Sequence, residues 1–142
     1  SCVILEITES ASIRLRDILL ENMRVLMDYG VKFALDDFGN GESNLNYIVD
    51  MPVSIVKFDR DMTQAYFSSY KAKFVMEAAM HMIHDMKLEV VSEGVETEEQ
   101  AQAIEALGIE YIQGYYFSRP LPGAEFLKFV AGNGQQAIYD GK

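Results

Sequence analysis

The chain has 142 residues, of which 49% are hydrophobic and 24% are charged, a composition typical of a globular protein and not of a disordered one. A formal net charge of −10 and the lack of any basic stripe argue against DNA or RNA as a partner. The single cysteine, Cys2, excludes an internal disulfide, and no apolar stretch approaches the roughly 18 residues that a membrane span needs.

The first half of the chain predicts three strands and two helices. In chain order these are a strand at Cys2–Thr8, a helix that ends before Gly30, a strand at Val31–Asp36, a short helix at Ser43–Val49 and a strand at Ser54–Phe58. The strands are short and apolar on both faces, as expected in a buried parallel sheet. The first helix carries an apolar stripe at Leu15, Leu19, Met23 and Leu26. Because an apolar run opens the sequence directly, we expect the chain to be part of a longer protein.

The second half predicts three helices and two strands. In chain order these are a long helix at Ala65–Met86, a strand at Leu88–Val91, a helix at Glu98–Leu107, a strand at Ile109–Ile112 and a helix from Pro122 to about Val130. The long helix has an apolar stripe at Val75, Ala79, Met82 and Met86. Thr97 is the expected N-cap of the following helix, and Gln100 completes a capping box. We expect one domain over residues 1–131 and a tail or linker over 132–142.

This alternation of strands and helices predicts right-handed crossovers and a parallel sheet. An open doubly wound sheet and a closed (β/α) barrel both fit the order of the elements. In either fold the carboxyl ends of the strands lie on one face, where ligands bind.

Polar residues lie toward this face on all five predicted strands. They are Glu6 on the first strand, Asp36 and Asp37 at the end of the second, Lys57 within the third, Glu93 and Glu96 after the fourth, and Gln113 after the fifth. Gly39 and Gly41 mark a turn after the paired aspartates, which would let both carboxylates serve one site. The sequence therefore predicts an acidic cluster with one lysine.

Carboxylates this close together repel one another, and divalent cations relieve the repulsion. Oxygen ligands without a cysteine or histidine cluster indicate Mg²⁺ or Mn²⁺ and not zinc. Two such ions are a recurrent device for hydrolysing phosphoesters. In that chemistry Lys57 would orient the attacking hydroxide or stabilise phosphoryl oxygens, and Glu93 is the candidate general base.

Simpler interpretations stand beside these. Asp36 and Asp37 could form a solvated turn, and Lys57 could be held by one carboxylate for packing alone. Glu96 could simply favour the start of a helix, and Gln113 could bond only to backbone. His81 and His84 lie three residues apart on one helix but have no third ligand, so we expect exposed histidines.

Five segments resemble those of EAL domains, the bacterial cyclic-di-GMP phosphodiesterases named for a Glu-Ala-Leu signature. The segments are "LEITES", "LDDFGNG", "VKFD", "VSEGVE" and "QGYYFSRPLP". They occur in the family's order and at roughly its spacing, from Glu6 to about Leu121. The five segments together are highly specific for this family, whereas any one segment alone would be weak evidence.

The resemblance implies a partial TIM-like (β/α) barrel with about five βα units of eight. It implies hydrolysis of cyclic-di-GMP to linear pGpG with two Mg²⁺ or Mn²⁺ ions. Matched residue by residue, the metal ligands are Glu6, Asp36, Asp37 and Glu93, the catalytic residues are Lys57 and Glu93, and the supporting or substrate-binding residues are Glu9, Gly39, Gly41, Glu96 and Gln113. It also implies a cytoplasmic domain that forms a homodimer through the loop and helix after Asp37, with membrane attachment only through other domains.

The departures from the family pattern define the alternatives. The Glu-Ala-Leu segment and a downstream asparagine, both metal ligands, belong upstream of Ser1, so we expect no turnover from this chain alone. Asn40, Glu42 and Ser92 replace a usual threonine, aromatic residue and alanine. The parent protein could be an active phosphodiesterase or a silent domain that acts as a cyclic-di-GMP receptor or binds a protein. The chain itself could also pair with a second copy as a half-barrel.

Overall fold

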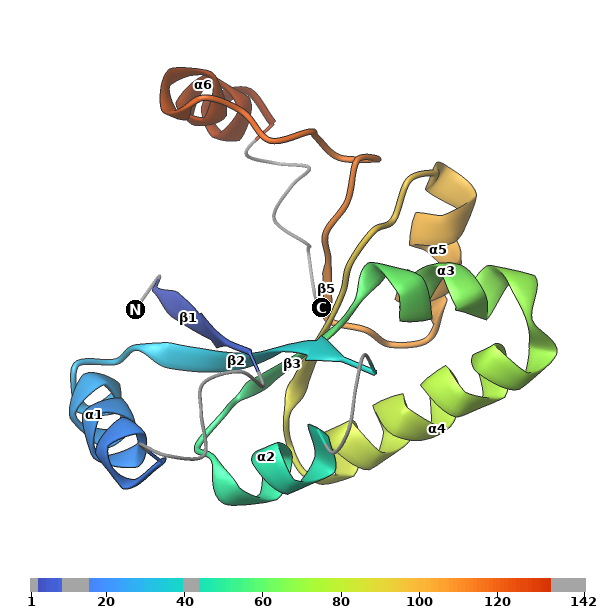
Figure 1. Ribbon diagram of the computed structural model, residues 1–142. Coiled ribbons are helices and arrows are strands. Elements are labelled where there is room, and N and C mark those ends of the chain that lie inside the picture. Colours follow the sequence, from blue (N-terminus) through green and yellow to red (C-terminus); the bar gives the residue numbers. More distant parts are fainter. Residues whose placement is uncertain (1–2, 9–15, 40–43, 134–142) are drawn as a thin grey trace.

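The structure is a computed structural model that describes residues 3–8, 16–39 and 44–133 (Figure 1). Its centre is a five-stranded parallel sheet with the strand order β1-β2-β3-β4-β5. The strands are β1 (Ile4–Ile7), β2 (Lys32–Phe38), β3 (Ile55–Phe58), β4 (Glu89–Ser92) and β5 (Tyr111–Ile112).

The strand order distinguishes between the two folds that the sequence left open. A doubly wound sheet reverses its strand order at a switch point, which creates its binding crevice. Here each strand pairs with the next one along the chain, and every pair is parallel. This consecutive order is that of a (β/α) barrel, so the described fold is a partial TIM-like barrel.

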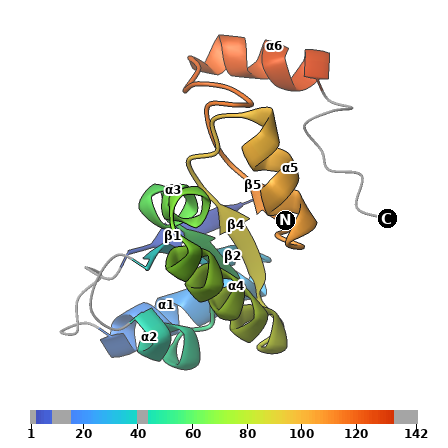
Figure 2. The ribbon, with the colours of Figure 1, turned by 90° about the vertical axis from the view of Figure 1, so that its right-hand side faces the viewer.

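Helices connect the strands. They are α1 (Arg16–Asp28), α2 (Asn44–Asp50), α3 (Arg60–Ser68), α4 (Tyr70–Asp85), α5 (Glu98–Ala106) and α6 (Gly123–Asn133). Figure 1 shows α1, α2 and α4 along one side of the sheet, whereas α6 stands apart from the sheet in both Figure 1 and Figure 2. Within the described ranges, none of these helices combines the length and the apolarity required to cross a bilayer.

The long helix expected at Ala65–Met86 is two helices, and that prediction is wrong. The chain becomes extended at Ser69 (φ −139°, ψ 123°), which separates α3 from α4. Ser69 bonds to both helices, because its N–H donates to the Ala65 carbonyl and its hydroxyl accepts from the Ala72 N–H. Asp59 caps α3, accepting a 2.8 Å hydrogen bond from the Met62 N–H, so helical structure begins five residues earlier than expected.

The buried face of α4 also differs from the predicted stripe. Met76, Met80 and Ile83 are the buried residues of α4, at spacings of four and three. Val75 and Met86, which were expected on that stripe, are 59% and 40% exposed. The core-facing side is therefore rotated by about one residue. It packs on β4, whose Val90 and Ser92 are buried.

Candidate active site

Lys57 is the centre of the candidate site and lies on β3, the middle strand. Its ammonium Nζ is 2.7 Å from Glu6 Oε1, 3.0 Å from Asp36 Oδ1 and 2.6 Å from Glu93 Oε1. The carboxylates come from β1, from β2 and from the residue after β4, which are brought together because parallel strands end on the same face. The Lys57 side chain is only 6% exposed, whereas Glu6 is 50% exposed. The sequence interpretation that these four residues converge is therefore confirmed.

The Lys57 ammonium remains charged in this setting. Burial on its own would lower the pKa of Lys57, but the hydrogen bonds that its ammonium donates to Glu6, Glu93 and Asp36 outweigh burial and raise that pKa well above its ordinary value. A lysine with a raised pKa cannot act as a base at neutral pH. Its chemistry is that of a fixed positive charge and a donor of hydrogen bonds.

The paired aspartates lie at a β-bulge in β2. The pairing with β3 advances from Leu35 to Phe38 on β2 while it advances only from Val56 to Phe58 on β3, so β2 contains one extra residue. Asp37 has a φ of 57°, in the left-handed region that aspartate tolerates better than most residues. Asp36 contacts Lys57, and Asp37 is exposed. The strand thus continues past the aspartates to Phe38, and the bulge provides the change of direction that we had expected from a turn.

Two glycines shape the rim near the Lys57 cluster. Gly94, directly after Glu93, has a φ of 73°, and a side chain there would collide with Arg60. Gly114, directly after Gln113, lies against the backbone of Val95, so any Cβ would overlap it. The backbones that follow β4 and β5 therefore approach each other closely, and Gln113 takes part through its own backbone by accepting from the Val95 N–H and donating to the Ser92 carbonyl.

The remaining predicted site residues lie in different surroundings. Glu96 forms its 2.8 Å ion pair with Arg60. Gly39 has a φ of 106°, where a side chain would press on Met62, consistent with a turn that requires glycine. Glu9 and Gly41 lie outside the described residues. The roles of all these residues as ligands or supporting groups remain predictions.

The donor chemistry of the cluster suits a hard divalent cation, because carboxylate oxygens are what Mg²⁺ and Mn²⁺ prefer. Glu6, Asp36 and Glu93 each direct one oxygen at Lys57, which leaves the other oxygen of each carboxylate for a second partner. Over residues 3–8, 16–39 and 44–133, however, no three His, Cys, Asp or Glu side chains are arranged to hold a metal ion by themselves. The ammonium of Lys57 is the cation around which these carboxylates gather.

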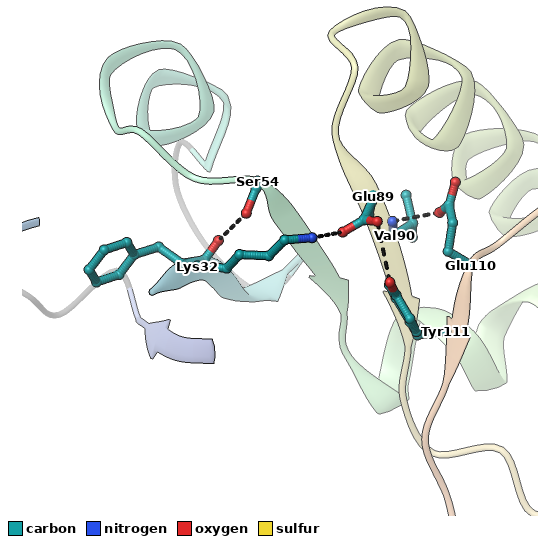
Figure 3. A network of polar contacts seen from close by, with 7 residues as sticks. Lys32, Ser54, Glu89, Val90, Glu110 and Tyr111 are labelled. Carbon is teal, nitrogen blue, oxygen red and sulfur yellow. Dashed lines mark hydrogen bonds and ion pairs between the residues drawn. The ribbon is translucent and has the colours of Figure 1, made fainter. Parts of the chain in front are cut away.

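A separate polar network lies at the opposite, amino-terminal ends of the strands (Figure 3). Lys32 pairs with Glu89 at 3.0 Å, and the Tyr111 hydroxyl donates to the same carboxylate at 3.3 Å. Glu110 accepts from the Val90 N–H at 2.8 Å and pairs with His84 at 3.0 Å. His81 is exposed as expected, whereas His84 is half-buried. In barrels this end of the sheet supports stability and not catalysis.

The profile of the EAL domain family matches residues 1–120. The chain belongs to the EAL domain family. Among curated relatives of this EAL chain, cyclic di-GMP phosphodiesterase RocR of Pseudomonas aeruginosa is 35% identical over 133 residues, which are 94% of this chain and 34% of RocR.

Solved EAL structures support the same fold. The EAL domain of Mycobacterium smegmatis DcpA superposes with a TM-score of 0.83 at 32% identity, covering 92% of this chain and 58% of that one. Klebsiella pneumoniae BlrP1, solved as a manganese and cyclic-di-GMP complex, has a TM-score of 0.73 at 31% identity, covering 83% of this chain and 30% of that one. The chain thus spans less than two thirds of each of these proteins.

Sequence reasoning missed the residues that hold the loop after β4. Thr63 bonds to Ser92, the last residue of β4, whereas Gln64 and Gln100 bond to the loop and to each other. Thr97 caps α5 as predicted, but Gln100 accepts from the N–H of Glu96 instead of the N–H of Thr97. The only available signal was Ser92 in place of the usual alanine, because its buried hydroxyl requires a partner, which is Thr63.

Proposed function

We propose that this chain is part of a metal-dependent hydrolase that cleaves cyclic-di-GMP to linear pGpG. The observation that carries the proposal is the convergence of Glu6, Asp36 and Glu93 on the buried Lys57 at the carboxyl end of the sheet. Support also comes from RocR, whose name describes this activity, and from BlrP1, which was solved with manganese and cyclic-di-GMP. The net charge of −10 agrees with a small-molecule substrate and not with DNA or RNA.

In this proposal Glu93 accepts the proton of the attacking water. Its Oε1 is held by Lys57 at 2.6 Å, which fixes the carboxylate and leaves Oε2 as the acceptor. Lys57 stays protonated, so it neutralises charge on the phosphoryl oxygens. Glu6, Asp36, Asp37 and Glu93 would hold Mg²⁺ or Mn²⁺ together with ligands from outside this chain. When bound, such ions supply charge stabilisation and acidify water.

Replacing the proposed base tests this function in the longer protein to which we assign the chain. With Mn²⁺ and cyclic-di-GMP, Glu93→Gln is expected to lower turnover by about 10²–10⁴-fold, because the amide cannot accept a proton in the way that a carboxylate does. Affinity for cyclic-di-GMP, measured by equilibrium dialysis, should remain largely intact, because glutamine has the same shape as glutamate and the groups around position 93 are unchanged.

The matched control is Glu98→Gln, which makes the same chemical change at an exposed position on α5 and should leave turnover unchanged. The 142-residue chain assayed alone should yield no linear product, because over its described residues no three His, Cys, Asp or Glu side chains are arranged to hold a metal ion by themselves. Unchanged turnover in Glu93→Gln would remove Glu93 from the base role. Tight binding without hydrolysis by the unmodified protein would instead indicate a receptor.

We also propose that the domain forms a homodimer through the loop and helix after Asp37, and that it works in the cytoplasm with membrane attachment, where present, supplied by other domains. The support for the dimer is the outward face of α2. Leu45 and Val49 lie four residues apart on this helix and are 54% and 73% exposed. Apolar side chains on one exposed helix face are typical of an interface.

Charge placed on that face should weaken the dimer. Val49→Glu is expected to shift the protein toward monomer in sedimentation velocity at micromolar concentration, because an interface would have to bury the new carboxylate. Val25→Glu on α1 is the control, since Val25 is also exposed, at 52%, but lies on another helix. An identical association constant for Val49→Glu and the unmodified protein would contradict this interface.

A further inference from the structure

Helix α3 presents three polar side chains to the segment that carries Glu93. Arg60, Thr63 and Gln64 are spaced at i, i+3 and i+4, so they lie on one face of the helix. Thr63 Oγ1 is 2.9 Å from Ser92 Oγ, and both residues are fully buried. These contacts begin one residue before Glu93.

The other two side chains of this face bind the residues that follow Glu93. Gln64 Nε2 donates to the Gly94 carbonyl at 2.6 Å, and the Arg60 guanidinium pairs with Glu96 at 2.8 Å. The contacts therefore fall on alternate residues, namely 92, 94 and 96.

The residues between these contacts point elsewhere. Glu93 directs its carboxylate to Lys57, and Val95 is completely buried in the core. The Glu93 N–H donates to the Phe58 carbonyl at 3.0 Å, which ties the same residue to β3. The residues on both sides of Glu93 are thus held by α3, and its own N–H is held by β3, so the backbone from which the Glu93 side chain projects is fixed.

Gln100 on α5 completes the arrangement from the other direction. Its Oε1 accepts from the Glu96 N–H at 2.8 Å, and its Nε2 donates to Gln64 Oε1 at 3.2 Å. The Gln64 amide thus uses its nitrogen on Gly94 and its oxygen on Gln100. It joins the loop to both flanking helices.

From this geometry we infer that Arg60, Thr63 and Gln64 are positioning residues that aim Glu93 at Lys57. Lys57 and these three residues lie on one continuous segment, 57–64, so this segment fixes both partners of the Lys57–Glu93 ion pair. The positioning role of these residues follows from their contacts, whereas its effect on hydrolysis rests on the proposed function. Gln64 is the best single test because it touches the loop and not the Lys57 cluster.

The test uses Gln64→Leu in the full 142-residue chain, with Gln102→Leu as the matched control. Gln102 also donates a side-chain hydrogen bond, to Glu98, but it is exposed and remote from the loop. The readout is the NMR scalar coupling between Lys57 Nζ and each carboxyl carbon, which is transmitted through the hydrogen bond from the ammonium to the carboxylate oxygen. Gln64→Leu should abolish the coupling to Glu93 while the couplings to Glu6 and Asp36 persist. Amide exchange at Glu96 should become about tenfold faster, as expected when the orienting hydrogen bonds are lost.

Arg60→Met is the second variant, and its exposed position makes misfolding less of a concern. It should weaken the Lys57–Glu93 coupling, and Arg60→Lys should restore it by keeping a charge opposite Glu96. Equal weakening of all three couplings, or no change in any of them, would overturn the inference. Because these couplings do not depend on hydrolysis, failure of the longer protein to cleave cyclic-di-GMP would overturn the proposed function and leave this result standing.

Discussion

At the scale of single residues, Lys57 determines how the acidic cluster holds together. Three carboxylates within 3.0 Å of one nitrogen would repel one another strongly without the ammonium. The lysine is nearly buried, so its charge is screened less by water than a surface charge would be. Lys57 therefore acts as an internal counter-ion as well as a candidate catalytic group.

Replacing Lys57 by methionine keeps the length of the side chain and removes its charge. We expect Lys57→Met to lower the free energy of unfolding by about 1–3 kcal/mol, because Glu6, Asp36 and Glu93 lose the cation that offsets their repulsion. Urea unfolding followed by circular dichroism at neutral pH measures this change. Lys71→Met makes the same substitution at an exposed site and should change stability little. Equal stability of the two variants would show that the cluster does not depend on Lys57.

At the scale of elements, sequence patterns predicted the strands and most helices because apolar runs and caps are local signals. Convergence of Glu6, Asp36, Lys57 and Glu93 was predictable because parallel strands share one carboxyl end. The break at Ser69 was missed because the sequence on both sides of it reads as helix. The partner of Glu96 was missed for another reason, since Arg60 lies 36 residues away and only the packing of α3 reveals the contact.

The β-bulge in β2 shows a further limit of sequence reasoning. Gly39 and Gly41 predicted a turn directly after the paired aspartates, whereas the strand first continues to Phe38 with one extra residue. A bulge inserts a residue without ending the strand, so the apolar run before it looks like that of a regular strand. Only the register against β3 identifies it.

At the scale of the whole molecule, charged networks support both ends of the sheet. The Lys57 cluster lies at the carboxyl end, and the Lys32–Glu89–Tyr111 network lies at the amino end (Figure 3). Hydrogen bonding to Glu89 raises the pKa of Lys32, and burial raises the pKa of the Tyr111 hydroxyl. The pKa of Lys57 is raised as well.

These three shifts have the same sign and predict loss of stability in alkali. A group whose pKa is higher in the folded protein stabilises it fully below the unfolded pKa, here 10.5 for lysine and 10.0 for tyrosine. That contribution disappears as the pH rises through the folded pKa. We expect the free energy of unfolding of the unmodified chain, measured with urea, to fall above about pH 10. In the double variant Lys32→Met with Tyr111→Phe the decline should be shallower, and an unchanged profile would contradict the contribution of this network.

The continuous segment from Lys57 to Gln64 has an evolutionary consequence. Successive helical residues are rotated by about 100°, so inserting or deleting one residue between Arg60 and Thr63 would turn Thr63 and Gln64 away from Ser92 and Gly94. Related proteins can therefore drift in the identity of their side chains here, but a gap or insertion within these eight positions would separate the lysine from its glutamate.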